Sequence, residues 1–105
     1  RIDLAVPVSY RVDDVVAAAL TLNLGEGGLA IRTMNPLDVS TTVRARFRLP
    51  GSTGEIEAES RVVWRDRRVG MGLQFEQMDA SDQTTIDEYV DQRHRAGPPH
   101  PEPER

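Results

Sequence analysis

The residues with the clearest chemical potential lie in one short segment, TLNLGEGG, which spans residues 21–28. An apolar run stops at Asn23, and three glycines follow at positions 25, 27 and 28 before the apolar pattern resumes with LAIRT. An asparagine amide both donates and accepts hydrogen bonds, and a glycine lets a ligand approach the backbone closely. The same residues suit a tight turn, because asparagine and glycine tolerate positive φ angles. The segment therefore predicts either a turn alone or a turn that holds a ligand.

Arginine is the second residue type that could bind a ligand. All 13 basic residues are arginines, and three of them alternate with apolar residues in the segment TVRARFRL, residues 42–49. Arginine suits phosphates and guanine edges, so the stripe resembles a nucleic-acid surface. However, a hairpin through LPGSTG would pair Arg44 with Glu59, Arg46 with Glu57 and Arg48 with Glu55. We therefore interpret the stripe as an exposed ladder of opposite charges.

Groups suited to catalysis or metal binding are sparse. The two histidines, His94 and His100, fall at the end of the predicted helix and in the tail, and the adjacent Asp13 and Asp14 fit a solvated turn. The chain has no cysteine, which excludes thiolate sites and fits a reducing cytoplasm. We therefore expect no enzyme, no metal and no resident cofactor.

Composition narrows the class of partner. The formal net charge of −4 argues against attraction to a nucleic-acid polymer or an anionic membrane surface. No apolar run approaches the length needed to span a bilayer. The 105 residues suffice for one domain with a modest core, and the start at Arg1 without methionine suggests a piece of a longer protein.

Alternation of apolar and polar residues, typical of strands, dominates the first three quarters of the chain. It predicts strands at residues 3–12, 16–22, 29–33, 42–49, 55–66 and 69–75. The residues expected to face the core are Leu4, Val6, Val8, Tyr10, Val12, Val16, Ala18, Leu20, Leu22, Leu29, Ile31, Thr33, Val43, Ala45, Phe47, Leu49, Ile56, Ala58, Val62, Trp64, Val69, Met71, Leu73 and Phe75.

The register of the second hairpin follows from this pattern. We expect Leu22 opposite Leu29 and Leu20 opposite Ile31, with Asn23 at the mouth of a four-residue loop and pointing away from the core. Gly70 and Gly72 are expected on the outer face, where another group can pack closely on the backbone.

The period changes at Asp79, which can cap a helix. Ile86, Tyr89, Val90 and Arg93 then follow at helical spacing. The prediction is an all-β fold, a six-stranded antiparallel barrel with a C-terminal helix, over residues 1–95. Residues 96–105 contain four prolines and no apolar pattern, and they are expected to form a disordered Pro-rich tail.

The prolines of this tail are Pro98, Pro99, Pro101 and Pro103. Such a proline content, without an apolar pattern, is typical of an extended linker or tail.

Three features together resemble the PilZ domain, a bacterial receptor module for cyclic di-GMP, and most closely the variety abundant in myxobacteria. NLGEGGLAIRT resembles the family motif D/N-x-S-x-x-G with its G-L-x-h-x-T continuation, where h is an apolar residue. RVVWRDRRVGMGLQF resembles the paired late strands of the family. The third feature is the order of six strands and a terminal helix, and the resemblance covers residues 1 to about 93.

The resemblance implies a site for cyclic di-GMP on the outer surface of the barrel. In the family, R-x-x-x-R before the first strand and D/N-x-S-x-x-G clamp the ligand. Arg1 matches the second arginine, and the first would lie four residues upstream of this chain. Asn23 matches the D/N and Gly28 the closing glycine, whereas Gly25 stands where the family has serine.

Two hypotheses follow from the resemblance. In the first, the chain is a cytoplasmic cyclic di-GMP receptor that regulates motility or surface polysaccharide through a partner protein or a flanking domain. In the second, it is a degenerate PilZ domain that binds no nucleotide and acts as a protein-interaction adaptor. A small nucleic-acid-binding barrel is a distant third, because the net charge and the glutamates oppose it.

Overall fold

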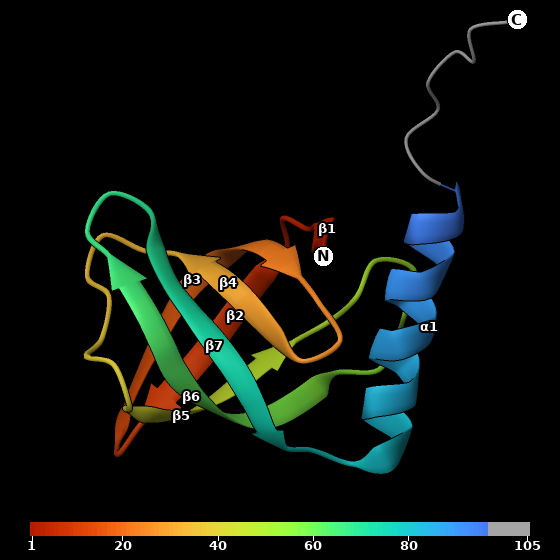
Figure 1. The fold of residues 1–105 in the computed structure, drawn as a ribbon. Coiled ribbons are helices and arrows are strands. Elements are labelled where there is room, and N and C mark those ends of the chain that lie inside the picture. Colours follow the sequence, from red (N-terminus) through yellow and green to blue (C-terminus); the bar gives the residue numbers. More distant parts are fainter. Residues whose placement is uncertain (97–105) are drawn as a thin grey trace, which may run out of the picture.

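Six antiparallel strands form a barrel, and a single helix lies along its side (Figure 1). The computed structural model describes residues 1–96. Its elements are β1 (Ile2–Asp3), β2 (Pro7–Val12), β3 (Val15–Leu24), β4 (Gly28–Arg32), β5 (Thr42–Phe47), β6 (Ile56–Asp66), β7 (Gly70–Gln77) and α1 (Ala80–Ala96). The strand order is β1-β3-β2-β5-β6-β7-β4, and β4 closes the barrel by pairing with β3. The predicted fold class is confirmed, with the two-residue β1 as an additional strand.

The segment expected as one strand, residues 3–12, is interrupted between β1 and β2, and both pieces pair with β3. Thr21 bridges the interruption. Its buried hydroxyl donates a hydrogen bond to the Leu4 carbonyl at 2.6 Å and accepts one from the Val6 amide at 2.9 Å. These bonds satisfy backbone groups that the interrupted ladder leaves free. As a result, β1 and Arg1 lie beside the end of β3 rather than in line with β2.

Apolar alternation correctly predicts the inward face of β5 and of the first half of β6. In the β5–β6 hairpin, Phe47 lies opposite Ile56 and Ala45 opposite Ala58, as expected. The Phe47 and Phe75 rings stack with their centroids 6.4 Å apart. The buried apolar residues of the core are Leu4, Val8, Tyr10, Leu24, Leu29, Ala30, Ile31, Val43, Ala45, Phe47, Leu49, Ile56, Ala58, Val62, Met71, Leu73, Ile86 and Val90.

The first half of β3 differs from the prediction. Val16, Ala18 and Leu20 face outward, with Val16 63% and Leu20 47% exposed. The register is also shifted, because Leu29 lies opposite Leu24 and Ile31 opposite Thr21. A bulge between Thr21 and Asn23 is the cause, since one extra residue exchanges the inward and outward positions of a strand.

A second bulge, between Val62 and Trp64, corrects the expectation that Trp64 is a core residue. Trp64 lies on the outer face, 38% exposed, and pairs with Gly72. A Cβ at Gly72 would collide with the indole, so the ring covers this glycine. The expectation that an outward glycine of β7 accommodates close packing is therefore confirmed at Gly72. Val69, also expected in the core, is 41% exposed in the turn before β7.

Helix α1 presents Ile86 and Val90 to the barrel, and both are buried, as the spacing predicts. Tyr89 packs at the margin of the core with the Arg93 guanidinium 4.8 Å from its ring centroid. The carbonyl of Asp79 accepts hydrogen bonds from the first turn. Within the described part of the chain, no helix is long and apolar enough to cross a membrane. The predicted tail lies outside the described residues except for Ala96, which ends α1.

Candidate functional site

Two of the residues matched to the family motifs are in direct contact. Asn23 lies on β3, and β1 pairs with this end of β3 through Ile2 opposite Leu24 and Asp3 opposite Asn23. The pairing places Arg1 beside Asn23, and Nη1 of Arg1 donates a hydrogen bond to Oδ1 of Asn23 at 2.7 Å. The structure thus brings together two side chains that are 22 residues apart in the chain.

The β3–β4 loop has three residues, 25–27, rather than the expected four. Three hydrogen bonds fix it. The Gly25 amide donates to the Gly28 carbonyl, the Phe75 amide of β7 donates to the Gly27 carbonyl, and Nε2 of Gln83 on α1 donates to the Glu26 carbonyl, each at 2.9 Å. The loop is therefore held by both β7 and α1 before any ligand arrives.

Of the loop glycines, Gly28 is required for space and not for an unusual φ angle. Among the described residues, the glycines with positive φ are Gly51 and Gly70, so the expected left-handed conformation is absent at Gly25 and Gly28. A Cβ at Gly28 would collide with the carbonyl oxygen of Leu73 on β7. A Cβ at Gly25 would lie 3.3 Å from Cγ of Arg1. The close approach of β7 therefore explains the glycine at position 28, whereas Gly25 lies against the side chain of Arg1.

A pocket of about 420 Å³ opens over this loop. Its lining includes Arg1, the loop residues 25–28, and Val90 and His94 of α1. His94 was missed as a site residue, because its place at the end of a helix gives no indication that the helix leans over the loop. Its Nε2 lies 3.5 Å from the backbone nitrogen of Arg1. Helix α1 therefore forms one wall of the pocket that contains three of the four matched positions.

The outward arginines of β5 are paired with glutamates, as predicted from the hairpin. Arg44 lies opposite Glu59 and Arg46 opposite Glu57 in the register, while Glu57 makes ion pairs with both arginines at 3.4 Å. The pKa of the Glu57 carboxyl lies below its ordinary value, first because Arg46 donates a hydrogen bond to it, and also because Arg44 does. The ladder is a solvated feature of the barrel surface and is remote in sequence from the matched motifs.

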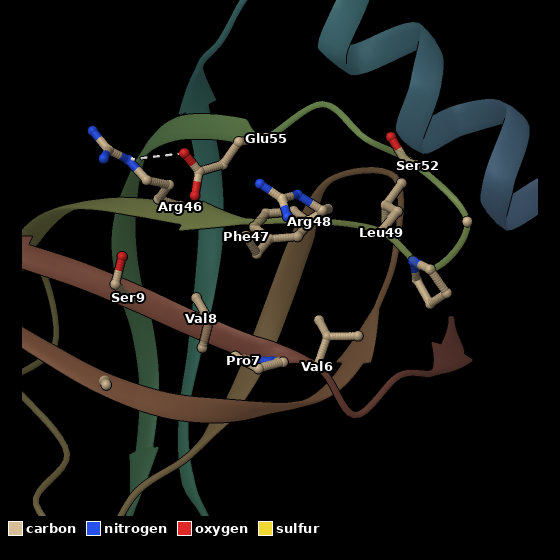
Figure 2. A pocket seen from close by; sticks show the side chains of 13 residues that line it. Val6, Pro7, Val8, Ser9, Arg46, Phe47, Arg48, Leu49, Ser52 and Glu55 are labelled. Carbon is tan, nitrogen blue, oxygen red and sulfur yellow. Dashed lines mark ion pairs between the residues drawn. The ribbon is translucent and has the colours of Figure 1, made fainter.

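A larger pocket, of about 580 Å³, lies elsewhere on the barrel (Figure 2). Its floor is apolar, with Val6, Pro7 and Leu49 among its lining residues, and none of the four matched motif residues contributes to it. Arg46 and Glu55 form an ion pair at its margin, with Nε and Oε1 3.8 Å apart (Figure 2). This pocket has the mixture of apolar floor and polar margin that suits a partner side chain or a small ligand.

Over residues 1–96, no three His, Cys, Asp or Glu side chains are grouped so that they could hold a metal ion. The buried polar side chains, Thr21 and Ser60, hydrogen-bond to backbone carbonyls. The arrangement is suited to binding, with a guanidinium and an imidazole beside a rigid loop.

Comparison with known proteins agrees with this fold. No curated protein sequence is similar enough to this chain to count as a match. Among solved structures, the Bacillus subtilis inhibitor of motility (MotI/DgrA) matches with a TM-score of 0.76 and 24% sequence identity, over 90% of this chain and 48% of that one. At this identity the match concerns the fold, and this chain spans about half the length of that protein. The family model of the PilZ domain matches residues 1–92, so this chain belongs to the PilZ domain family.

Proposed function

We propose that this domain is a cytoplasmic bacterial receptor for cyclic di-GMP, which binds at the pocket over the β3–β4 loop. In this proposal, the domain regulates motility or surface polysaccharide through a partner protein or a flanking domain. The observation that carries the proposal is the 2.7 Å hydrogen bond between Arg1 and Asn23 at the edge of a pocket that Gly25 and Gly28 also line.

The Arg1 guanidinium suits a guanine or a phosphodiester. It carries five N–H donors, and Asn23 accepts a bond from one of its nitrogens, so that other donors face solvent. A forked guanidinium matches the O6 and N7 acceptors of guanine and the oxygens of a phosphate. Because Asn23 already holds the side chain, less conformational freedom is lost when a ligand binds.

Two departures from the family pattern reduce the expected affinity. Gly25 supplies no hydroxyl, and the first arginine of R-x-x-x-R would lie upstream of Arg1. A good arginine–guanine contact contributes about 1–3 kcal/mol, whereas a micromolar complex has about 8 kcal/mol in total. If an arginine stands four residues before Arg1, its contact with guanine would strengthen binding by about 1–3 kcal/mol, or about fivefold to a hundredfold.

Calorimetric titration with cyclic di-GMP tests the proposal, in a chain extended upstream of Arg1. Arg1→Ala and Asn23→Ala should each weaken binding about tenfold, the equivalent of about 1.4 kcal/mol. Arg48→Ala is the matched control, because Arg48 is exposed and does not line the pocket over the loop. Absence of heat at high micromolar ligand, or an equal loss in the control, would contradict the proposal.

The adaptor hypothesis remains the second candidate, and a different observation favours it. Val16 and Leu20 lie on the outward face of β3 with Ala18 between them, and they are 63% and 47% exposed. Adjacent exposed apolar residues are typical of surfaces that bind other proteins. An adaptor would bind its partner protein without nucleotide. Val16→Asp would abolish this partner binding, and Arg1→Ala would leave it intact. The receptor hypothesis instead predicts that Arg1→Ala removes the response to nucleotide.

A further inference from the structure

The pocket over the β3–β4 loop contains a titratable side chain that the family motifs do not include. We propose that protonated His94, together with Arg1, forms an anion-binding subsite of this pocket that contacts a phosphodiester of the bound cyclic dinucleotide. The inference rests on the proposed function and adds that binding is controlled by pH through α1.

The packing of α1 holds His94 at the pocket. Val90, one helical turn before His94, is 3% exposed and seats this part of the helix on the barrel. At the other end of the helix, Gln83 donates to the Glu26 carbonyl at 2.9 Å and to Oδ1 of Asp87 at 2.8 Å. Helix and loop are thus fixed relative to each other, and the imidazole is exposed where a ligand over the loop would reach it.

The net charge of the pocket lining depends on whether His94 is protonated. The side chains of Arg1 and Glu26 both line the pocket and carry opposite charges, so with neutral His94 the side chains of the lining carry no net charge. Asp91, on the neighbouring turn of α1, is paired with Arg95 at 2.9 Å. The whole chain has a formal net charge of −4. A cyclic dinucleotide brings two negative phosphodiesters, so a protonated His94 supplies the cation that the lining otherwise lacks.

Hydrogen bonding leads to the same expectation. In neutral His94, Nε2 can accept a bond from the backbone nitrogen of Arg1, 3.5 Å away. In the protonated ring both nitrogens are donors, so Nε2 turns from accepting to donating and is available to a phosphate oxygen. Because histidine changes charge between pH 5 and 8, the affinity should rise as the pH falls through this range.

Titrations with cyclic di-GMP at pH 7.5 and 5.5 test the inference. As in the test of the proposed function, the chain is extended upstream of Arg1, so that the backbone nitrogen of Arg1 beside His94 is an amide and does not titrate. Aspartate and glutamate side chains keep their charge over this interval. We expect wild-type affinity to rise about fivefold at the lower pH, the size expected of an exposed charge pair. His94→Gln should show no rise, and His94→Lys should bind tightly at both values.

Two control variants separate the subsite from other effects. His100→Gln removes the other histidine and should keep the full rise. Arg67→Gln removes an exposed positive charge outside the pocket lining, and should also keep it. If wild type binds without pH dependence, or if His94→Gln keeps the dependence, the inference is wrong while the proposed function stands. If no variant binds at either pH, both are wrong.

Discussion

Serine at position 25 should tighten cyclic di-GMP binding, because it restores the hydroxyl that the family motif has at this place. The backbone permits the change, since φ of Gly25 is outside the left-handed region. The new Cβ would lie 3.3 Å from Cγ of Arg1 and 3.7 Å from its Nη1. The first distance requires Arg1 to shift by a few tenths of an ångström, which a flexible side chain can do, and the second brings the hydroxyl near the guanidinium.

The size of the gain follows from the hydrogen bonds of the loop. A hydroxyl that bonds the ligand or orients Arg1 contributes about 0.5–1.5 kcal/mol, or about twofold to tenfold in affinity. Replacing a flexible glycine often adds a further entropic gain. Here the entropic gain should not change the affinity, because the loop is already ordered in the free protein. The Gly25 amide and the carbonyls of Glu26 and Gly27 are hydrogen-bonded there.

Calorimetry of wild type, Gly25→Ser and Gly25→Ala measures this effect. Alanine supplies the same Cβ and the same contact with Arg1 but no hydroxyl, so it should bind no more tightly than wild type. Combination with Asn23→Ala should remove the gain, because Arg1 is then no longer held. If Gly25→Ser folds and binds no more tightly, or if alanine gives an equal gain, the reasoning from the hydroxyl is refuted.

Two further predictions concern stability. Gly28→Ala should lower the free energy of unfolding, measured by chemical denaturation, by about 1–3 kcal/mol, because its Cβ meets the Leu73 carbonyl and β4 must move away from β7. Gly27→Ala is the control, since its Cβ meets nothing within 4 Å. Equal stability of the two variants would contradict the packing argument. The lowered pKa of Glu57 means that its charge stabilises the fold at neutral pH and that this contribution is lost as the pH falls below 4.5. Glu57→Gln should therefore reduce the loss of the free energy of unfolding that accompanies acidification. Glu59→Gln, whose carboxylate makes no ion pair within residues 1–96, should leave that loss unchanged.

Much of the barrel could be predicted from alternation, and the errors have one physical origin. The pairing of Phe47 with Ile56 was correct, because both strands keep a strict period of two and the glutamates complement the arginines. Val16 and Trp64 were placed on the wrong face because a bulge shifts the phase of each strand. A bulge adds a single residue without a distinctive type, so the apolar pattern does not reveal it.

The candidate site was predicted less completely than the fold. The motif match identified Arg1 and Asn23, which the structure places in contact. The reason for glycine at position 28 could not be predicted, because the obstacle is a carbonyl 45 residues later in the chain, on Leu73. His94 could not be assigned either, since its place over the loop depends on how α1 docks and not on its own sequence neighbours.

The contact between Arg1 and His94 also brings the first residue of the domain to the final turns of its helix. Domains whose ends meet can be inserted into a loop of another protein, or reconnected in a new order, with little disturbance of their cores. In this domain the junction is also the edge of the pocket over the β3–β4 loop. A segment that preceded Arg1 would therefore start at the rim of that pocket, within reach of a molecule bound there.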